Sequence, residues 1–233
     1  MKTATVRPRL GTRGQPEQTR AAILEAALKE FAAEGISGAR TDAIARAAGV
    51  NKALLYYYFH DKEALYGSAL DHVFSGLTQR LEQALKPELS PKEKIVAYVK
   101  AHFDYIAGNP IYPRMVQREM MRASSATSLH IGSPHMRQMV DRYFRPTFLK
   151  LAQILQDGIA AGEFRPVQPA HFIPSMIAII VFYFINTPVV RLIVPGDPLS
   201  PERIAERRAA VLDFISTALF RVPESAGAKE MLS

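Results

Sequence analysis

Cysteine is absent from the 233 residues of the chain. Its absence excludes disulfide bonds and metal sites built on thiolates, and it suits a reducing compartment. We therefore expect a cytoplasmic protein. The arginines near the N-terminus are not followed by an apolar core, so we expect no secretory signal.

Motifs of catalysis and nucleotide binding are also missing. The chain has no G-x-S-x-G, P-loop, G-x-G-x-x-G or H-E-x-x-H sequence. His130 and His135 are five residues apart in an expected loop, and His102 and Asp104 point to opposite sides of an expected helix. Neither spacing is typical of a metal site or a catalytic pair. We expect no enzyme, no metal and no cofactor.

No segment alternates apolar and polar residues over the length of a strand, and no internal repeat is present. The sequence therefore predicts an all-α protein. Apolar residues make up 48% of the chain, which is enough for one large or two small cores.

The chain is short of acidic residues at its N-terminus. The formal net charge is +7, and residues 1–20 hold five Lys or Arg against one Asp or Glu. Residues 1–15 are polar and aperiodic, which is typical of a flexible arm. Either the arm has no role, or Arg7, Arg9 and Arg13 follow a DNA backbone or enter a minor groove.

One long stretch, residues 172–190, has no charged residue. Its length approaches that of a membrane span, but Pro174, Asn186 and Pro188 interrupt it. We favour a helix buried on all sides by protein and keep a membrane-anchored or purely structural helical protein as the alternative.

Residues 41–65 show the most specific pattern. They follow an expected helix that begins at Pro16, ends at Gly35 and supplies one apolar face. Thr41 can cap a second short helix that stops at Gly49, and Asn51 can cap a third over residues 52–59. Two short helices joined by a tight turn with Gly form a helix-turn-helix, whose second helix enters the DNA major groove.

These residues resemble the TetR family of transcriptional regulators. Its pattern is T-x-x-x-I-A-x-x-A-G-V, a small polar residue, three variable positions, L-Y-x-[HY]-F and then K-[ED]-x-L. The matching residues here are Thr41, Ile44, Ala45, Ala48, Gly49, Val50, Asn51, Leu55, Tyr56, Tyr58, Phe59, Lys62, Glu63 and Leu65.

The resemblance implies roles for individual residues. Lys52, Ala53 and Tyr57 match positions that touch base edges, and Lys52 could donate to guanine O6 or N7. The positions that bind phosphates in the family correspond here to Thr41, Tyr56, Tyr58 and Lys62, with Asn51 as the cap between the helices. Ala53 replaces a frequent Gly, and Leu54 replaces a Thr or Ser that often donates to phosphate. The three tyrosines cannot all face inward, although they could simply shield the core.

The chain beyond residue 65 is expected to be helical. A rod over residues 62–85, about 36 Å long at 1.5 Å per residue, either transmits motion or merely connects domains. We expect a flexible basic arm (1–15), the DNA-binding domain (16–65), a helical effector-binding and dimerisation domain (66–223) and a tail (224–233).

Several later helices combine aromatic residues, methionines and a few polar groups, as small-molecule sites do. Each residue could equally be core, and the resemblance implies an effector pocket. The candidates are Tyr98, His102, Phe103, Tyr105, Met115, Glu119, Met120, Phe144, Phe148, Phe172 and Tyr183.

A recognition helix reads only a few base pairs, so a two-fold dimer is expected to present two of them. The last two apolar helices supply surface for a four-helix interface like that of the family. The candidate residues are Met176, Ile177, Ile180, Phe184, Val211, Leu212, Ile215 and Leu219. The overall prediction is a homodimeric repressor that binds a palindromic operator and is released by a small apolar or amphipathic effector.

Overall fold

The computed structural model describes residues 16–125 and 133–221, with the side chains of residues 123–125 left aside. The prediction of an all-α fold is confirmed, since the described residues form helices and no strand, apart from one isolated bridge between Phe164 and Phe220. The α-helices are α1 (Pro16–Gly38), α2 (Thr41–Ala47), α3 (Lys52–Phe59), α4 (Lys62–Ala84), α5 (Pro91–Gly108), α6 (Ile111–Ser125), α7 (Pro134–Met139), α8 (Arg145–Ala160), α9 (Pro169–Ile185), α10 (Thr187–Ile193) and α11 (Pro201–Leu219).

Local sequence signals account for most helix ends. Asn51 accepts from the N–H of Leu54 at 2.7 Å and so caps α3, as expected. Ser90 and Glu93 form the capping box that opens α5. Thr41 is not a cap, because it is already the first residue of α2 and the capping position belongs to Arg40, whose side chain makes no capping bond.

Glycine and proline mark two irregular places in the helices. Gly35 has φ of +66° and bends α1 near its end, which is a conformation that glycine adopts without strain. A π-helical turn, Val140–Phe144, joins α7 to α8 just before Pro146.

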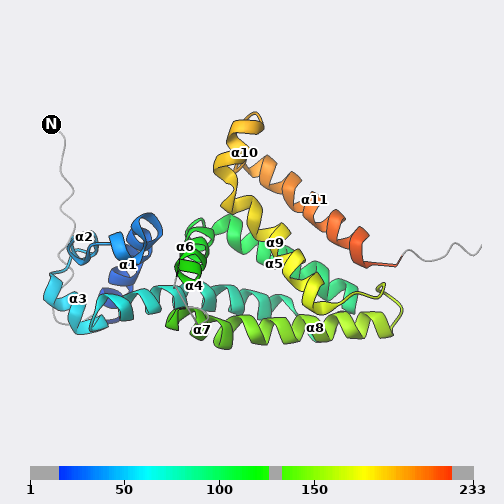
Figure 1. Cartoon of the computed structure of the whole chain (residues 1–233), viewed down its shortest axis with the longest axis horizontal. Helices are drawn as coiled ribbons and strands as arrows, with labels where there is room; N and C mark the ends of the chain where they lie inside the picture. Colours follow the sequence, from blue (N-terminus) through cyan, green and yellow to red (C-terminus); the bar gives the residue numbers. More distant parts are fainter. Residues whose placement is uncertain (1–15, 126–132, 222–233) are drawn as a thin grey trace, which may run out of the picture. The chain divides into compact units, whose positions relative to one another are not determined.

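The chain forms two compact units. The first contains α1 to α3, the part of α4 up to Leu77, α6 and α7, while the second contains α5, α8 to α11 and the rest of α4. In the first unit α1 packs against α2 and α6, and in the second unit α5 packs against α8, α9 and α11 (Figure 1). The expected domain boundary at residue 65 separates α6 and α7 from the DNA-binding helices. The two compact units instead group α6 and α7 with those helices.

The charge-free stretch at residues 172–190 does not form one buried helix. It breaks at Asn186 into α9 and α10, and Phe182 is 60% exposed. The expectation of one continuous helix over this stretch was therefore wrong. Among the described residues no single helix is long and apolar enough to cross a membrane, and α9 and α10 satisfy that test only as a pair bent by 68°.

Candidate DNA-binding site and effector region

The helix-turn-helix is held from inside by apolar contacts. Ile44, Leu55 and Phe59 are buried, as is the apolar face of α1 that the sequence predicted, and α2 packs against both α1 and α3. Gly49, at φ of +73°, makes the tight turn between α2 and α3. The buried residues fix which side of α3 faces outward.

The outward side of α3 carries the residues expected to meet bases. Lys52 and Ala53 are exposed, and Tyr57 is 76% exposed with its ring edge-to-face against Tyr58. Leu54 is half-buried. An exposed phenol and an exposed ammonium give the outward side of α3 both apolar and donor groups, as base edges require.

The residues expected to bind phosphates cluster at the start of α2 and around α3. The hydroxyl groups of Thr41 and Tyr56 lie 3.2 Å apart and share a hydrogen bond. Lys62 donates from Nζ to the backbone carbonyl of Ala39 at 3.2 Å. These contacts hold the hydroxyl and ammonium groups in place before any DNA arrives. Arg7, Arg9 and Arg13 lie outside the described residues.

The turn between α3 and α4 is strained. His60 has φ of 60° and ψ of −60°, and the N–H of Asp61 donates to the carbonyl of Phe59 at 2.6 Å. This is a γ-turn of the rare kind with positive φ. Asp61 then accepts from the N–H of Ala64 at 2.7 Å and caps α4.

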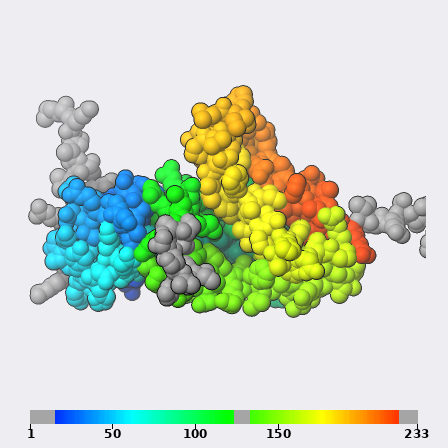
Figure 2. Space-filling model, viewed as in Figure 1, coloured from blue at the N-terminus to red at the C-terminus, as the bar shows by residue number. Residues whose placement is uncertain are grey.

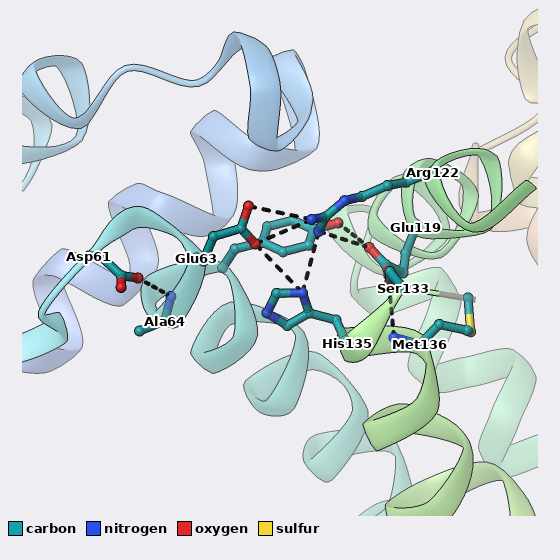
Figure 3. A network of polar contacts seen from close by, with 9 residues as sticks. Asp61, Glu63, Ala64, Glu119, Arg122, Ser133, His135 and Met136 are labelled. Atoms are coloured by element: carbon teal, nitrogen blue, oxygen red, sulfur yellow. Dashed lines mark hydrogen bonds and ion pairs between the residues drawn. The ribbon is translucent and has the colours of Figure 1, made fainter. Parts of the chain in front are cut away.

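A partly buried polar network joins α4, α6 and α7 in the first unit (Figure 3). Glu119 is 1% exposed and accepts from the hydroxyl of Tyr66 at 3.0 Å and from the hydroxyl of Ser133. Arg122 lies 3.3 Å from a carboxylate oxygen of Glu63. Burial, followed by the Glu119 carboxylate, raises the pKa of the Tyr66 phenol well above its usual range.

The expected effector residues divide between the two units. Met115, Glu119 and Met120 belong to the first unit, and the other eight belong to the second. Met120 is 54% exposed because it lies one position beyond the inward face of α6 that holds Met115 and Glu119. An exposed thioether does not line an interior pocket, so the expectation for Met120 was wrong.

The eight residues of the second unit are buried or half-buried. Tyr98, His102 and Phe103 on α5 are buried, and Tyr105, Phe144, Phe148, Phe172 and Tyr183 are half-buried. His102 Nδ1 lies 3.1 Å from the Tyr98 hydroxyl, and burial lowers the pKa of His102 to about 4. The imidazole is therefore neutral near pH 7, and it lies within hydrogen-bonding distance of the Tyr98 hydroxyl.

The residues expected at the dimer interface mostly fill the interior of a single chain. Met176, Ile180, Val211, Ile215 and Leu219 are each at most 2% exposed, while Ile177, Phe184 and Leu212 are half-buried. Side chains that pack α9 and α11 onto their own chain are not available to a second copy. The other faces of the same helices carry Phe182 and Phe214, each 60% exposed.

Sequence reasoning missed several polar contacts between helices. Asp42 and Lys52 form an ion pair, and Arg118 and Arg122 tie α6 to the rest of the first unit. These contacts join positions far apart in the chain, so helical periodicity gives no signal for them. The described residues include no cluster that could hold a metal ion.

Two family models cover most of the chain. "Bacterial regulatory proteins, tetR family" matches residues 23–69, and "Tetracyclin repressor-like, C-terminal domain" matches residues 91–215. The chain belongs to the TetR family. The resemblance read from residues 41–65 is thereby confirmed.

Individual relatives agree with this assignment. The transcriptional repressor SCO4008 of Streptomyces coelicolor is 30% identical over 78% of this chain and 85% of its own length. The repressor KstR2 of Mycolicibacterium smegmatis is 27% identical over 86% of this chain and 92% of its own length. The structure of the ketosteroid transcriptional regulator KstR2 of Mycobacterium tuberculosis matches with a TM-score of 0.68 and 20% identity, covering 93% of this chain and all of that one.

This TetR-family chain is a DNA-binding transcriptional regulator and not an enzyme, as predicted. Its relatives are named as repressors, and the two-part helical fold matches theirs.

Proposed function

We propose that the chain binds a palindromic operator as a homodimer and represses the genes behind it until a small effector releases it. The observation that carries the proposal is the outward face of α3, which exposes Lys52 and the 76% exposed Tyr57 on the same short helix as Tyr56, whose hydroxyl pairs with Thr41. A dimer would present two such faces to successive major grooves, about 34 to 36 Å apart or a multiple of that. Such a protein would work in the cytoplasm, where its operator lies.

The dimer surface we propose differs from the one that the sequence suggested. Phe182 on α9 and Phe214 on α11 are exposed, and α11 packs on α9 through a hydrogen bond from Arg207 Nη2 to the carbonyl of Ile179 at 3.3 Å. Figure 2 shows the yellow and gold atoms of α9 and α10 uncovered on the viewed face of the second unit, beside the orange atoms of α11. Large exposed apolar side chains on neighbouring helices favour burial against a second copy.

The dimer surface can be tested by introducing charge. Phe182→Arg and Phe214→Arg are expected to give monomers in sedimentation experiments and to lose binding to a palindrome. Leu149→Arg on α8 is the matched control, because Leu149 is 61% exposed outside this surface. Dimers that survive both phenylalanine changes would place the interface elsewhere.

The effector is expected to be apolar or amphipathic and to bind in the second unit. The buried and half-buried aromatic residues there, with His102 and Tyr98 as polar anchors, support this class. Because a structural neighbour is described as a ketosteroid regulator, ketosteroids are a reasonable first group to test.

The proposed release mechanism relies on α4, which supplies residues to both units. In this mechanism the effector shifts α4 and thereby moves the recognition helices. It can release the operator only if it binds the DNA-free form more tightly than the DNA-bound form. Footprinting of genomic fragments with and without candidate effectors tests the whole proposal. Equal effector affinity in the presence and absence of operator would rule out this mechanism, and the lack of any preferred duplex would rule out the function.

The N-terminal arm is a separate part of the proposal. Deleting residues 1–13, which include Arg7, Arg9 and Arg13, should weaken non-specific binding most at low salt. Unchanged binding after the deletion would leave the arm without a role in DNA contact.

A further inference from the structure

Asp42 lies on the first turn of α2, opposite the start of the recognition helix. Its Oδ1 is 3.1 Å from Nζ of Lys52, and both side chains are 51% exposed. The same ammonium lies 5.9 Å from the centre of the Tyr56 ring. The lysine expected to meet a base is therefore held by a carboxylate from the neighbouring helix.

We infer that Asp42 is a specificity-determining residue, which limits the non-specific DNA binding of Lys52 while leaving its contact with one base pair intact. The inference rests on the proposed function. Phosphates repeat along every duplex, so any free lysine at the interface strengthens binding to all sequences alike. Lys52 paired with Asp42 adds no net charge to the interface.

The geometry leaves Lys52 able to read a base. An ammonium group has three N–H donors, so one can remain on Asp42 while the others reach guanine O6 and N7. The hydrogen bond to Asp42 raises the pKa of Lys52, which keeps the lysine charged in the pair. A contact between Lys52 and a phosphate gains less free energy than the same contact from an unpaired lysine. The reason is that the Asp42 carboxylate stays beside the ammonium whichever sequence is bound.

The pair has no evident structural duty. Exposed ion pairs contribute little to folding, and both partners here are half exposed. Asp42 and Lys52 belong to different helices that are already fixed by the buried Ile44 and Leu55. A change at Asp42 should therefore alter DNA binding without unfolding the domain.

The test compares Asp42→Asn with Glu34→Gln in the full-length protein. Glu34 is an exposed carboxylate near the end of α1, so both variants lose one negative charge from the same unit. Binding to the mapped operator and to a random duplex is measured over a salt series. For Asp42→Asn, the slope of log affinity against log salt on random DNA should steepen by about 0.9, because one more phosphate is neutralised. The ratio of operator to random affinity should fall by roughly three- to tenfold.

A second background separates this role from general repulsion. In a Lys52→Ala protein, Asp42→Asn should leave the slope on random DNA unchanged, since the lysine that it frees is gone. An equal steepening in that background, or an Asp42→Asn variant that behaves like Glu34→Gln, would overturn the inference alone. A wild-type protein with no preference for any duplex would overturn the proposed function as well.

Discussion

Arg118 on α6 donates from Nε to the backbone carbonyl of Ala32 at 3.0 Å, near the end of α1. A second hydrogen bond runs from the same guanidinium to the carbonyl of Ala33. Both carbonyls lie just before the bend of α1 at Gly35, and a carbonyl oxygen carries partial negative charge, so the guanidinium makes charge-assisted hydrogen bonds with them. Through this contact α6 is attached to a helix of the DNA-binding domain.

Replacing Arg118 by Ala should lower the free energy of unfolding by about 1 to 2 kcal/mol, because charge-assisted hydrogen bonds to two carbonyls are lost. Urea-induced unfolding measures the effect. Arg114→Ala, one turn earlier on α6 at an exposed position, should change stability by less than about 0.5 kcal/mol. Equal effects of the two changes would show that Arg118 does not stabilise α1.

Glu119 should be among the polar residues least tolerant of change in the first unit. Glu119→Gln puts an amide where two hydroxyl groups donate, and we expect a loss of about 1 to 3 kcal/mol. Glu82→Gln, at an exposed position on α4, is the matched control. A double-mutant cycle with Tyr66→Phe should show coupling of at least about 0.5 kcal/mol, and additive effects would mean that the Tyr66 hydrogen bond is unimportant.

The contrast between these residues and the helix caps shows what the sequence can predict. Asn51, Asp61 and Ser90 act on backbone groups within three or four residues, so their role follows from local spacing. Arg118 and Ala32 are 86 residues apart, and their contact depends on how α6 packs against α1. The sequence therefore predicted the helix-turn-helix but not the residues that attach α6 to it.

The dimer surface shows a second limit. Apolar periodicity assigned one face of α9 and one face of α11 to the dimer interface, and Ile180 and Ile215 on those faces are buried within the single chain. Periodicity cannot say whether a face is buried in its own chain or against another. The exposed Phe182 and Phe214 lie outside the expected stripes, so only the fold points to them.

Lys62→Ala should weaken binding to all duplexes alike and lower the salt slope by about one unit, since Lys62 matches a phosphate-binding position of the family. Lys29→Ala is the control, because Lys29 is exposed on α1 and paired with Glu25. Titrations at several salt concentrations measure both slopes. If Lys62→Ala leaves the slope unchanged, the ammonium serves only the carbonyl of Ala39.

His102 should make the protein less stable in mild acid. Its pKa is lowered to about 4 by burial. Between about pH 6.5 and 4, His102 is therefore protonated in the unfolded chain and neutral in the folded chain. Stability should fall by about 1.4 kcal/mol per pH unit between pH 6.5 and 4 and be unaffected by this residue above that range. His102→Gln should flatten the slope, whereas His171→Gln, at an exposed position, should not.

His60 should be a site where glycine stabilises the protein. Its φ of 60° costs a side chain about 1 to 3 kcal/mol, and glycine adopts that conformation without strain. Glycine loses more chain entropy on folding, which offsets part of this gain. His60→Gly should therefore raise the free energy of unfolding by about 1 kcal/mol. The same change at His72, exposed inside α4, should lower it by about 1 kcal/mol, because helical glycine is unfavourable. Thermal or urea unfolding of both variants gives the comparison. A destabilised His60→Gly protein would mean that the imidazole makes contacts worth more than the strain of the γ-turn.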